Sequence, residues 1–267
     1  DGRRWSASGV SIDSRKVQPK DIFIAFRGSR VDGHCYVADA FEKGAAAAIV
    51  ERKIDGLSEE SPILIVQNVQ KALVQIACLA RNRSEAEFVA VTGSVGKTSS
   101  KNLLAKALAQ FDSVHATIGN LNNHIGAPLS LARLHGSSRF AVFELGMNNT
   151  GEIAFLSNLI RPKVALITNV HGVHLEQLKT ERAIAEAKAE IFNGLSENGS
   201  VVLNQDNPWI DFLKSRAEKK GIKNIITFGE DKKSDVQLLE WQPGEGKSFV
   251  KVQLKSETHQ YVLSEIG

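Results

Sequence analysis

The chain has 267 residues, enough for one large domain or two ordinary ones, and its 42% hydrophobic and 24% charged residues are typical of a globular protein with a real core. Its 33 basic and 30 acidic residues nearly cancel, which argues against a dedicated nucleic-acid-binding protein. No apolar run approaches the roughly 20 residues of a membrane-spanning helix, so neither a nucleic acid nor a membrane is an expected partner.

Residues 1–84 are predicted to form a small α/β domain. Apolar patterns predict strands over 21–26, 46–50 and 63–66 and helices over 36–43 and 69–82. The polar loops 13–15 and 27–34 carry arginines and a histidine, which either serve ordinary turns or hold a phosphorylated ligand; spacing leaves both interpretations open. The polar, apolar-poor stretch 81–85 marks the expected domain boundary.

Residues 85–267 are predicted to form a second α/β domain, in which strands alternate with helices. Near-continuous apolar strands, such as 141–143 and 164–167, indicate a mostly parallel sheet covered by helices. Ligands of such sheets bind at the carboxyl ends of the strands. Beyond residue 229, short alternating segments predict an added antiparallel meander. The predicted strands are 88–91, 114–117, 140–145, 164–170, 200–204, 224–228, 236–241, 249–254 and 260–263, and the predicted helices are 97–111, 127–134, 151–160, 181–195 and 208–220.

Two cysteines, Cys35 and Cys78, lie far apart and in no metal-binding spacing. We expect both to be buried apolar residues rather than a disulfide, which fits a reducing compartment such as the cytoplasm. We also expect a monomer. No signal peptide is visible, and because the chain starts without Met and stops at Gly267 in mid-pattern, we expect it to be trimmed at both ends.

A glycine-rich loop joins the predicted strand 88–91 to the predicted helix 97–111. Gly93 and Gly96 permit a tight turn that brings backbone N–H groups to an anion, and the helix N-terminus adds positive partial charge. Lys97 can reach the β- and γ-phosphates of a nucleotide, and the Thr98 hydroxyl is placed to ligate Mg²⁺. The loop is shorter than the common phosphate-loop motif, because Val91 stands where that motif has its first glycine.

Several side chains follow the predicted strand ends. A carboxylate at Glu144, which closes a buried strand, needs a partner or a metal, and Mg²⁺ in the same crevice favours the metal over a capping role. His171 and His174 follow the next strand, and one of them facing that crevice is preferred to a zinc site. Asn122 belongs to an asparagine-rich loop, 119–126, that either serves the turn or orients a polar substrate.

Lys188 lies on the apolar face of the predicted helix 181–195, four residues after Ile184 and three before Ile191. Its ammonium either reaches an edge or points into the metal crevice. In the second case an ammonium about 4 Å from Mg²⁺ would cost about 8 kcal/mol at an effective dielectric constant of about 20. The lysine would then be neutral, displaced or converted to an anion, as carbamylation by CO₂ does.

These motifs together resemble the Mur ligase family of peptidoglycan synthesis, and they occur in the family's order over almost the whole chain. The residues that carry the resemblance are Asp13-Ser14-Arg15, Asp21-Ile22-Phe23, Asp32-Gly33-His34, Thr92-Gly93-Ser94-Val95-Gly96-Lys97-Thr98, Gly119-Asn120-Leu121-Asn122-Asn123, Glu144-Leu145-Gly146-Met147-Asn148, Gly151-Glu152-Ile153, His174-Leu175-Glu176, Ala187-Lys188-Ala189-Glu190-Ile191 and Leu203-Asn204-Gln205-Asp206.

The resemblance implies an ATP- and Mg²⁺-dependent ligase, most similar to the member that joins D-alanyl-D-alanine to UDP-N-acetylmuramoyl-tripeptide through an acyl phosphate. Residues 1–84 would bind the UDP-linked substrate, and residues 85–267 would be the central ATP-binding domain, incomplete at its C-terminus. The implied roles are ATP binding for Gly93, Ser94, Val95, Gly96, Lys97, Thr98, Ser99 and Asn204; metal binding for Thr98, Glu144, His174 and a carbamylated Lys188; catalysis for Lys97, Lys188 and His174; and substrate binding for Ser14, Arg15, Asp32, His34, Asn120, Asn122 and Asn123.

Other activities compete with this one. A sister ligase would add a single amino acid, or glutamate to folate, and the 119–123 loop favours the dipeptide-adding member. A phosphate-loop kinase of small molecules would make no amide, and a non-catalytic UDP-sugar-binding module would not need Lys97 and Thr98. Family chains end in a third domain, absent here, so we expect this chain alone to form no amide at a useful rate.

Overall fold

The computed structural model describes residues 6–28, 31–58, 60–172 and 180–263. Contacts divide the chain into two compact units, one of Asp1–Ser84 with Pro128–Gly136 and one of Glu85–Ala127 with Ser137–Gly267. The predicted first domain did not include 128–136. Arg133 attaches this segment to the first unit, because its Nε donates a 2.6 Å hydrogen bond to the carbonyl of Val10.

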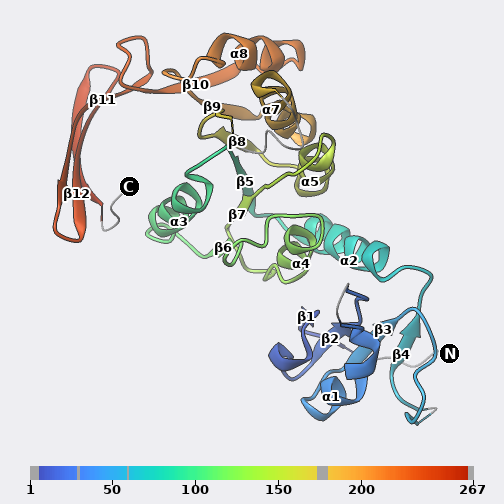
Figure 1. The fold of residues 1–267 in the computed structure, drawn as a ribbon. Helices are drawn as coiled ribbons and strands as arrows, with labels where there is room; N and C mark the ends of the chain where they lie inside the picture. Colours follow the sequence, from blue (N-terminus) through green and yellow to red (C-terminus); the bar gives the residue numbers. More distant parts are fainter. Residues whose placement is uncertain (1–5, 29–30, 59, 173–179, 264–267) are drawn as a thin grey trace. The chain divides into compact units, whose positions relative to one another are not determined.

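The first unit is built on a parallel four-stranded sheet in the order β1-β2-β3-β4 (Figure 1). The edge strand β1 was not predicted. Asn68 is the N-cap of the α2 helix, and its side chain accepts the N–H of Lys71. The elements of the first unit are β1 (Gly9–Ser11), η1 (Ser14–Lys16), β2 (Asp21–Ile24), η2 (Gly33–Tyr36), α1 (Val37–Glu42), β3 (Ala47–Val50), β4 (Ile63–Ile65) and α2 (Val69–Arg83).

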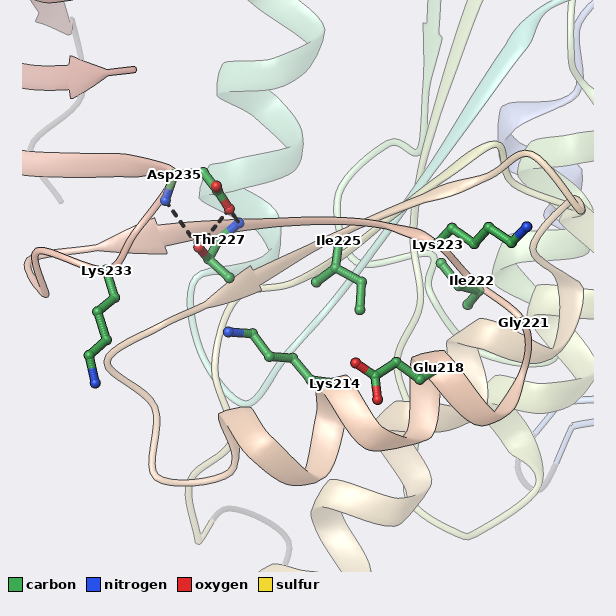
Figure 2. A pocket seen from close by; sticks show the side chains of 9 residues that line it. All are labelled: Lys214, Glu218, Gly221, Ile222, Lys223, Ile225, Thr227, Lys233 and Asp235. Atoms are coloured by element: carbon green, nitrogen blue, oxygen red, sulfur yellow. Dashed lines mark hydrogen bonds between the residues drawn. The ribbon is translucent and has the colours of Figure 1, made fainter. Parts of the chain in front are cut away.

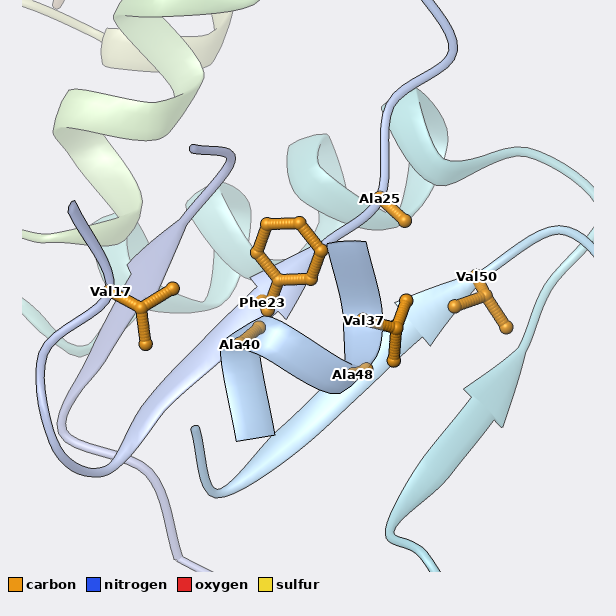
Figure 3. Close-up of a cluster of buried hydrophobic side chains, with 7 residues drawn as sticks. All are labelled: Val17, Phe23, Ala25, Val37, Ala40, Ala48 and Val50. Carbon is orange, nitrogen blue, oxygen red and sulfur yellow. The ribbon is translucent and has the colours of Figure 1, made fainter. Parts of the chain in front are cut away.

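A small apolar core lies between α1 and this sheet (Figure 3). Phe23 of β2 and Val37 of α1 are its bulkier members and are almost fully buried. Alanines at Ala40 and Ala48 allow the helix and strand to pack closely. The cluster consists of Val17, Phe23, Ala25, Val37, Ala40, Ala48 and Val50.

The two cysteines do not lie in this core, and the prediction that they are buried was wrong. Cys35 and Cys78 are exposed free thiols. Cys35 lies in the one-turn helix η2, two residues before the buried Val37 of α1. Cys78 follows the buried Ala77 on α2. Neighbouring positions of a helix point in different directions, so each thiol faces outward.

The second unit contains a nine-stranded sheet in the order β13-β12-β11-β10-β9-β8-β5-β7-β6. The strands from β6 to β11 pair in parallel, and β11, β12 and β13 pair antiparallel, so the predicted meander continues the parallel sheet through β10. Figure 1 shows α3 on one side of this sheet and α5 and α7 on the other. Its elements are β5 (Glu87–Thr92), α3 (Lys97–Leu108), β6 (Val114–Ala116), α4 (Gly126–Ala132), which continues into the first unit, β7 (Phe140–Glu144), α5 (Glu152–Ile160), β8 (Val164–Ile167), α7 (Glu181–Ala189), η3 (Glu190–Gly194), β9 (Ser200–Asn204), α8 (Ile210–Lys219), β10 (Asn224–Gly229), β11 (Val236–Gly244), β12 (Lys247–Leu254) and β13 (Glu257–Leu263).

Two helices differ from their predicted bounds by three or more residues. The α3 helix ends at Leu108, and Phe111, the last residue of the predicted helix, is 81% exposed because it lies in the turn that follows. The predicted helix 181–195 is α7 followed by the tighter turn η3. There the side chain of Glu190 accepts the N–H groups of Gly151 and Ala154 and so holds η3 against the start of α5.

Across the parts of the chain that the structure describes, no helix combines the length and the hydropathy that a transmembrane segment requires.

Candidate active site

Strand register brings the sequence-predicted residues to one edge of the nine-stranded sheet. Val91 of β5 pairs with Glu144 of β7, and Thr92 pairs with Ile167 of β8. Because these strands are parallel, their carboxyl ends open at the same edge. The glycine loop leaves β5 at that edge and enters α3 at Lys97.

The two loop glycines have different tasks. At Gly93, a Cβ would lie 1.8 Å from Thr168 Oγ1, so no larger residue fits between the loop and the end of β8. Gly96 has φ of 78° and immediately precedes α3, in a left-handed conformation that favours glycine. The first helical hydrogen bond here runs from the N–H of Ser100 to the carbonyl of Gly96. The earlier N–H groups therefore remain as donors for an anion.

Thr98 and Glu144 meet at this edge, as metal binding would require. Thr98 Oγ1 donates a 2.8 Å hydrogen bond to Glu144 Oε2. Asn122 Nδ2 donates one of 2.7 Å to Glu144 Oε1, so both carboxylate oxygens have a donor although Glu144 is 1% exposed. A hydroxyl and a carboxylate are ligands that Mg²⁺ accepts. The pair fits a magnesium ion that takes its remaining ligands from phosphate and water.

Lys97 is folded back on its own loop. Its Nζ donates to the carbonyl of Gly93 at 2.8 Å and to that of Ser94 at 3.2 Å. Burial lowers the pKa of Lys97, and the charge of Glu144 opposes this shift. The ammonium is thus held at the loop that a phosphate would enter.

Lys188 lies on the buried face of α7, as its spacing predicted, and is 2% exposed. Burial, with the charge of Lys97 as a second cause, lowers the pKa of Lys188 to about 7. A substantial fraction of this side chain is therefore a neutral amine near pH 7. A neutral amine is the form that reacts with CO₂.

The predicted asparagines are not equivalent. Asn122 reaches Glu144, but Asn123 Oδ1 accepts the N–H groups of Ile125 and Gly126 and so serves the start of α4. Asn204, at the end of β9, donates to the carbonyl of Thr168 at 3.2 Å, which brings it to the same edge. For Asn120 a backbone contact is described, from the N–H of Asn122 to its carbonyl.

The histidine prediction falls partly outside the described residues, because His174 lies in 173–179. His171 lies at the loop, where its N–H and its carbonyl both bond to Ser94 Oγ at 2.9 Å. Nowhere in 6–28, 31–58, 60–172 or 180–263 do three or more His, Cys, Asp or Glu side chains form a cluster able to hold a metal. Thr98 with Glu144 is an oxygen-donor pair at this edge of the sheet.

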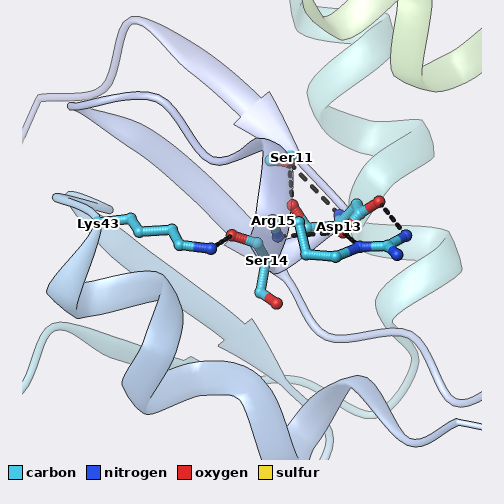
Figure 4. A network of polar contacts seen from close by, with 5 residues as sticks. All are labelled: Ser11, Asp13, Ser14, Arg15 and Lys43. Atoms are coloured by element: carbon cyan, nitrogen blue, oxygen red, sulfur yellow. Dashed lines mark hydrogen bonds and ion pairs between the residues drawn. The ribbon is translucent and has the colours of Figure 1, made fainter.

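In the first unit, Ser14 and Arg15 line a cavity of about 480 Å³. Arg15 pairs with Asp13 through two side-chain hydrogen bonds of 2.9 and 2.8 Å (Figure 4). This pairing lowers the pKa of Asp13 to about 2. Lys43 holds the same turn by donating to the carbonyl of Ser14 at 3.0 Å. An arginine fixed beside a cavity can recognise a phosphate or carboxylate.

The side chains of Asp32 and His34 instead form a hydrogen bond with each other. His34 is 4% exposed, its Nε2 accepts the N–H of Glu51 at 2.9 Å, and its Nδ1 lies 2.6 Å from Asp32 Oδ1. Accepting at Nε2 places the proton of a neutral ring on Nδ1, so Nδ1 donates to Asp32. The backbone N–H of His34 also bonds to this carboxylate and is the main cause that lowers the pKa of Asp32 to about 2. Both ring nitrogens of His34 are thus engaged within the protein.

Sequence reasoning assigned no individual role to two residues at the site, Asn169 and Lys101. Asn169 contacts the glycine loop through its side chain. Lys101, 1% exposed on α3, donates to the carbonyls of Thr117 and Gly119 and so fixes the start of the asparagine loop. The signal for Asn169 is its place after β8, beside the strand that carries the loop. Lys101 lies one turn after Lys97 on α3, and no sequence pattern distinguishes it from an exposed helical lysine.

A further cavity, of about 720 Å³, lies elsewhere in the second unit, between α8 and β10 (Figure 2). Lys214 and Lys233 line it, and Asp235 bonds to the N–H and the hydroxyl of Thr227 at 2.8 Å each. The residues of the glycine loop do not line it.

Comparison with known proteins supplies the family. Residues 91–267 match the Mur ligase middle domain, and residues 6–81 match the catalytic domain of the Mur ligase family. The chain is 42% identical over 220 residues to UDP-N-acetylmuramoyl-tripeptide–D-alanyl-D-alanine ligase of Escherichia coli, covering 82% of this chain and 48% of that protein. It is 40% identical over 231 residues to the ligase of the same name from Rickettsia prowazekii, covering 86% and 51%.

A solved structure of a Mur ligase has a similar fold. The structure of MurF ligase from Thermotoga maritima in complex with ADP has a TM-score of 0.81 and 30% identity, covering 96% of this chain and 58% of that one. The chain spans about half the length of the curated relatives that it matches. The family matches cover most of the chain, and the strand-end site agrees with them: the chain belongs to the Mur ligase family.

Proposed function

We propose that the complete gene product joins D-alanyl-D-alanine to UDP-N-acetylmuramoyl-tripeptide with consumption of ATP. The observation that carries the proposal is the meeting of Thr98, Glu144 and Lys97 at the glycine loop. Relatives at 40% and 42% identity bear the name of this ligase, which supports the choice of substrates. Synthesis of a cell-wall precursor from these substrates would take place in the cytoplasm.

In the first chemical step, a carboxylate oxygen of the tripeptide attacks the γ-phosphorus of ATP, and ADP leaves. Lys97 and the N–H groups at the start of α3 stabilise the charge on the transferring phosphoryl group. Thr98 and Glu144 would hold Mg²⁺, which neutralises phosphate charge when bound. In the second step, the amine of D-alanyl-D-alanine attacks the acyl carbon, loses a proton and expels inorganic phosphate.

Lys188 contributes as a carbamate in this proposal. Its neutral amine attacks CO₂, a nitrogen–carbon bond forms, and loss of one proton leaves an anion. Its pKa of about 7 makes the neutral form available. A carbamate would supply an oxygen donor for a second Mg²⁺, together with His174.

The first unit would bind the UDP portion. Support comes from the cavity lined by Ser14 and Arg15, where a paired guanidinium is available to a diphosphate. Asp32 and His34 would shape the neighbouring loop rather than contact the substrate, because their side chains bond to each other. Asn122 would act on Glu144, and Asn204 would lie near the adenine.

One assay tests the proposal and separates it from its rivals. ADP release by the complete gene product is measured with UDP-N-acetylmuramoyl-tripeptide, with and without D-alanyl-D-alanine. Release that depends on the dipeptide, with formation of an amide and free phosphate, is expected. A stable phosphoester product would instead indicate a kinase, and turnover with a single amino acid would indicate a sister ligase.

A further inference from the structure

Asn169 holds two consecutive N–H groups of the glycine loop. Its Oδ1 accepts the N–H of Ser94 at 3.1 Å and that of Val95 at 3.0 Å. Because two backbone donors converge on one atom, that atom is the amide oxygen and not the nitrogen. The backbone carbonyl of Asn169 also accepts the N–H of Ser94, at 3.1 Å.

Neighbouring residues strengthen this attachment. Thr168 Oγ1 donates to the carbonyl of Val95 at 2.6 Å. Ser94 Oγ donates to the carbonyl of His171 and accepts its N–H, both at 2.9 Å. Residues 168–171 therefore hold the loop through side chains and backbone together, and we call them the loop clasp.

The same two peptide groups are held at their other ends by Lys97. The carbonyl of Gly93 belongs to the peptide whose N–H is that of Ser94, and the carbonyl of Ser94 belongs to the peptide whose N–H is that of Val95. Lys97 Nζ donates to both carbonyls, at 2.8 and 3.2 Å. Asn169 Oδ1 and Lys97 Nζ thus grip two successive peptides from opposite ends.

Burial alone does not require this arrangement. Val95 is 54% exposed, so water could satisfy its N–H group without a side-chain acceptor. Engaging the N–H groups of Ser94 and Val95 leaves those of Gly96 to Ser99, before the first helical hydrogen bond, for an anion. The clasp thus sorts the loop donors into a structural pair and a ligand-binding set.

We propose that Asn169 is a positioning residue for nucleotide binding: it orients the two peptides that hold Lys97, and so places the Lys97 ammonium for the phosphates. This inference rests on the proposed function, in which the loop binds ATP. Without the amide oxygen, the Ser94 N–H keeps the backbone carbonyl of Asn169 as an acceptor, but the peptide that carries the Val95 N–H can rotate. Its carbonyl, that of Ser94, then no longer converges with that of Gly93, and the ammonium loses its fixed place.

The test measures binding of a fluorescent ATP analogue with Mg²⁺ to the 267-residue chain. Asn169→Ala should weaken binding about tenfold or more, and hydrogen exchange should become faster at the Val95 amide, whose described acceptor is Asn169 Oδ1. Asn68→Ala is the matched control, because Asn68 Oδ1 likewise accepts a backbone N–H, at 2.8 Å from Lys71 N, but in the first unit. The control should lower the melting temperature and leave nucleotide affinity unchanged.

A conservative variant guards against misfolding. Asn169→Asp keeps an acceptor oxygen at the same reach, so slow exchange at both amides should persist. In the complete gene product, Asn169→Ala should raise KM for ATP more than it lowers kcat, and leave KM for D-alanyl-D-alanine unchanged.

The possible outcomes distinguish the role of Asn169 from the proposed nucleotide function. Asn169→Ala binding within twofold of the parent, unchanged exchange at the Val95 amide in that variant, or fast exchange at the Val95 amide in Asn169→Asp would overturn the role of Asn169. A folded parent chain that binds the analogue no better than Lys97→Ala would instead count against the proposed nucleotide function.

Discussion

Asn122 Nδ2 donates a hydrogen bond of 2.7 Å to Glu144 Oε1, while Thr98 Oγ1 donates one of 2.8 Å to Oε2 of the same carboxylate. The space around Asn122 is tight, because a Cβ at Gly146 would lie 2.7 Å from its Oδ1. The amide is therefore fixed on one side and bonded on the other. Asn122 orients the carboxylate that the proposal assigns to Mg²⁺.

We expect Asn122→Ala to raise the Mg²⁺ concentration needed for half-maximal activity and to lower kcat/KM by about 10- to 100-fold, as loss of a partner of a metal ligand typically does. The measurement is a Mg²⁺ titration of ADP release. Asn123→Ala is the control, because Asn123 caps α4. It should cost about 1 kcal/mol of stability and leave the Mg²⁺ dependence unchanged. An unaltered titration curve in Asn122→Ala would refute this role.

Lys97→Ala should abolish turnover of the complete gene product, because it removes the positive charge that stabilises the transferring phosphoryl group. Lys71→Ala, an exposed lysine on α2, should leave activity unchanged. Steady-state ADP release measures both. If Lys97→Ala kept more than about a tenth of parental activity, which corresponds to a rise of under about 1.4 kcal/mol in the activation barrier, the assigned role would be wrong.

Lys188 should make stability depend on pH above neutrality. Its pKa is about 7 in the folded chain, where burial is the main cause, against 10.5 in the reference state. Between these values the unfolded chain binds a proton that the folded chain lacks, so the free energy of unfolding rises with pH by at most about 1.4 kcal/mol per unit.

Lys188→Met, an apolar replacement of similar length, should remove this slope. Near pH 7 in CO₂-free buffer the variant should be more stable than the parent, and the difference should shrink as pH rises to 9. Denaturant unfolding at several pH values measures this. Parallel stability curves for the two proteins would show that Lys188 is not the titrating group.

A second prediction for Lys188 concerns catalysis. Lys188→Ala should be inactive, and short carboxylates such as acetate should restore part of the activity, because they return an anion to the site. Asn123→Ala, which keeps Lys188, should gain nothing from the added carboxylate. The checks are ADP release against carboxylate concentration and a high-resolution density map of the parent. An unmodified ammonium in that map, under ample CO₂ and Mg²⁺, would contradict carbamylation.

Arg15→Ala should raise KM for the UDP-linked tripeptide by about tenfold and leave KM for ATP unchanged, because Arg15 lines the cavity of the first unit. Arg52→Ala is the matched control. Arg52 pairs with Asp32 at 3.0 Å and does not line that cavity. Equal KM changes in the two variants would argue against a substrate contact at Arg15.

Local pattern alone was sufficient for the glycine loop, the alternation of strands and helices, and the burial of Lys188. Each rests on short-range physics: a turn that needs glycine, a period of about two or 3.6 residues, or spacing along one helix. The rule that ligands meet parallel strands at their carboxyl ends also brought Glu144 to the loop, and the pairing of Val91 with Glu144 confirms that position.

Tertiary structure decided which residues become partners. Asn169 and Ser94 are 75 residues apart, and they meet because β8 lies beside β5, an order of strands that no local period encodes. The same holds for Asn122 and Asn123, which are neighbours in one loop. One reaches Glu144 and the other caps α4, since backbone direction at each position sets where an identical side chain can bond.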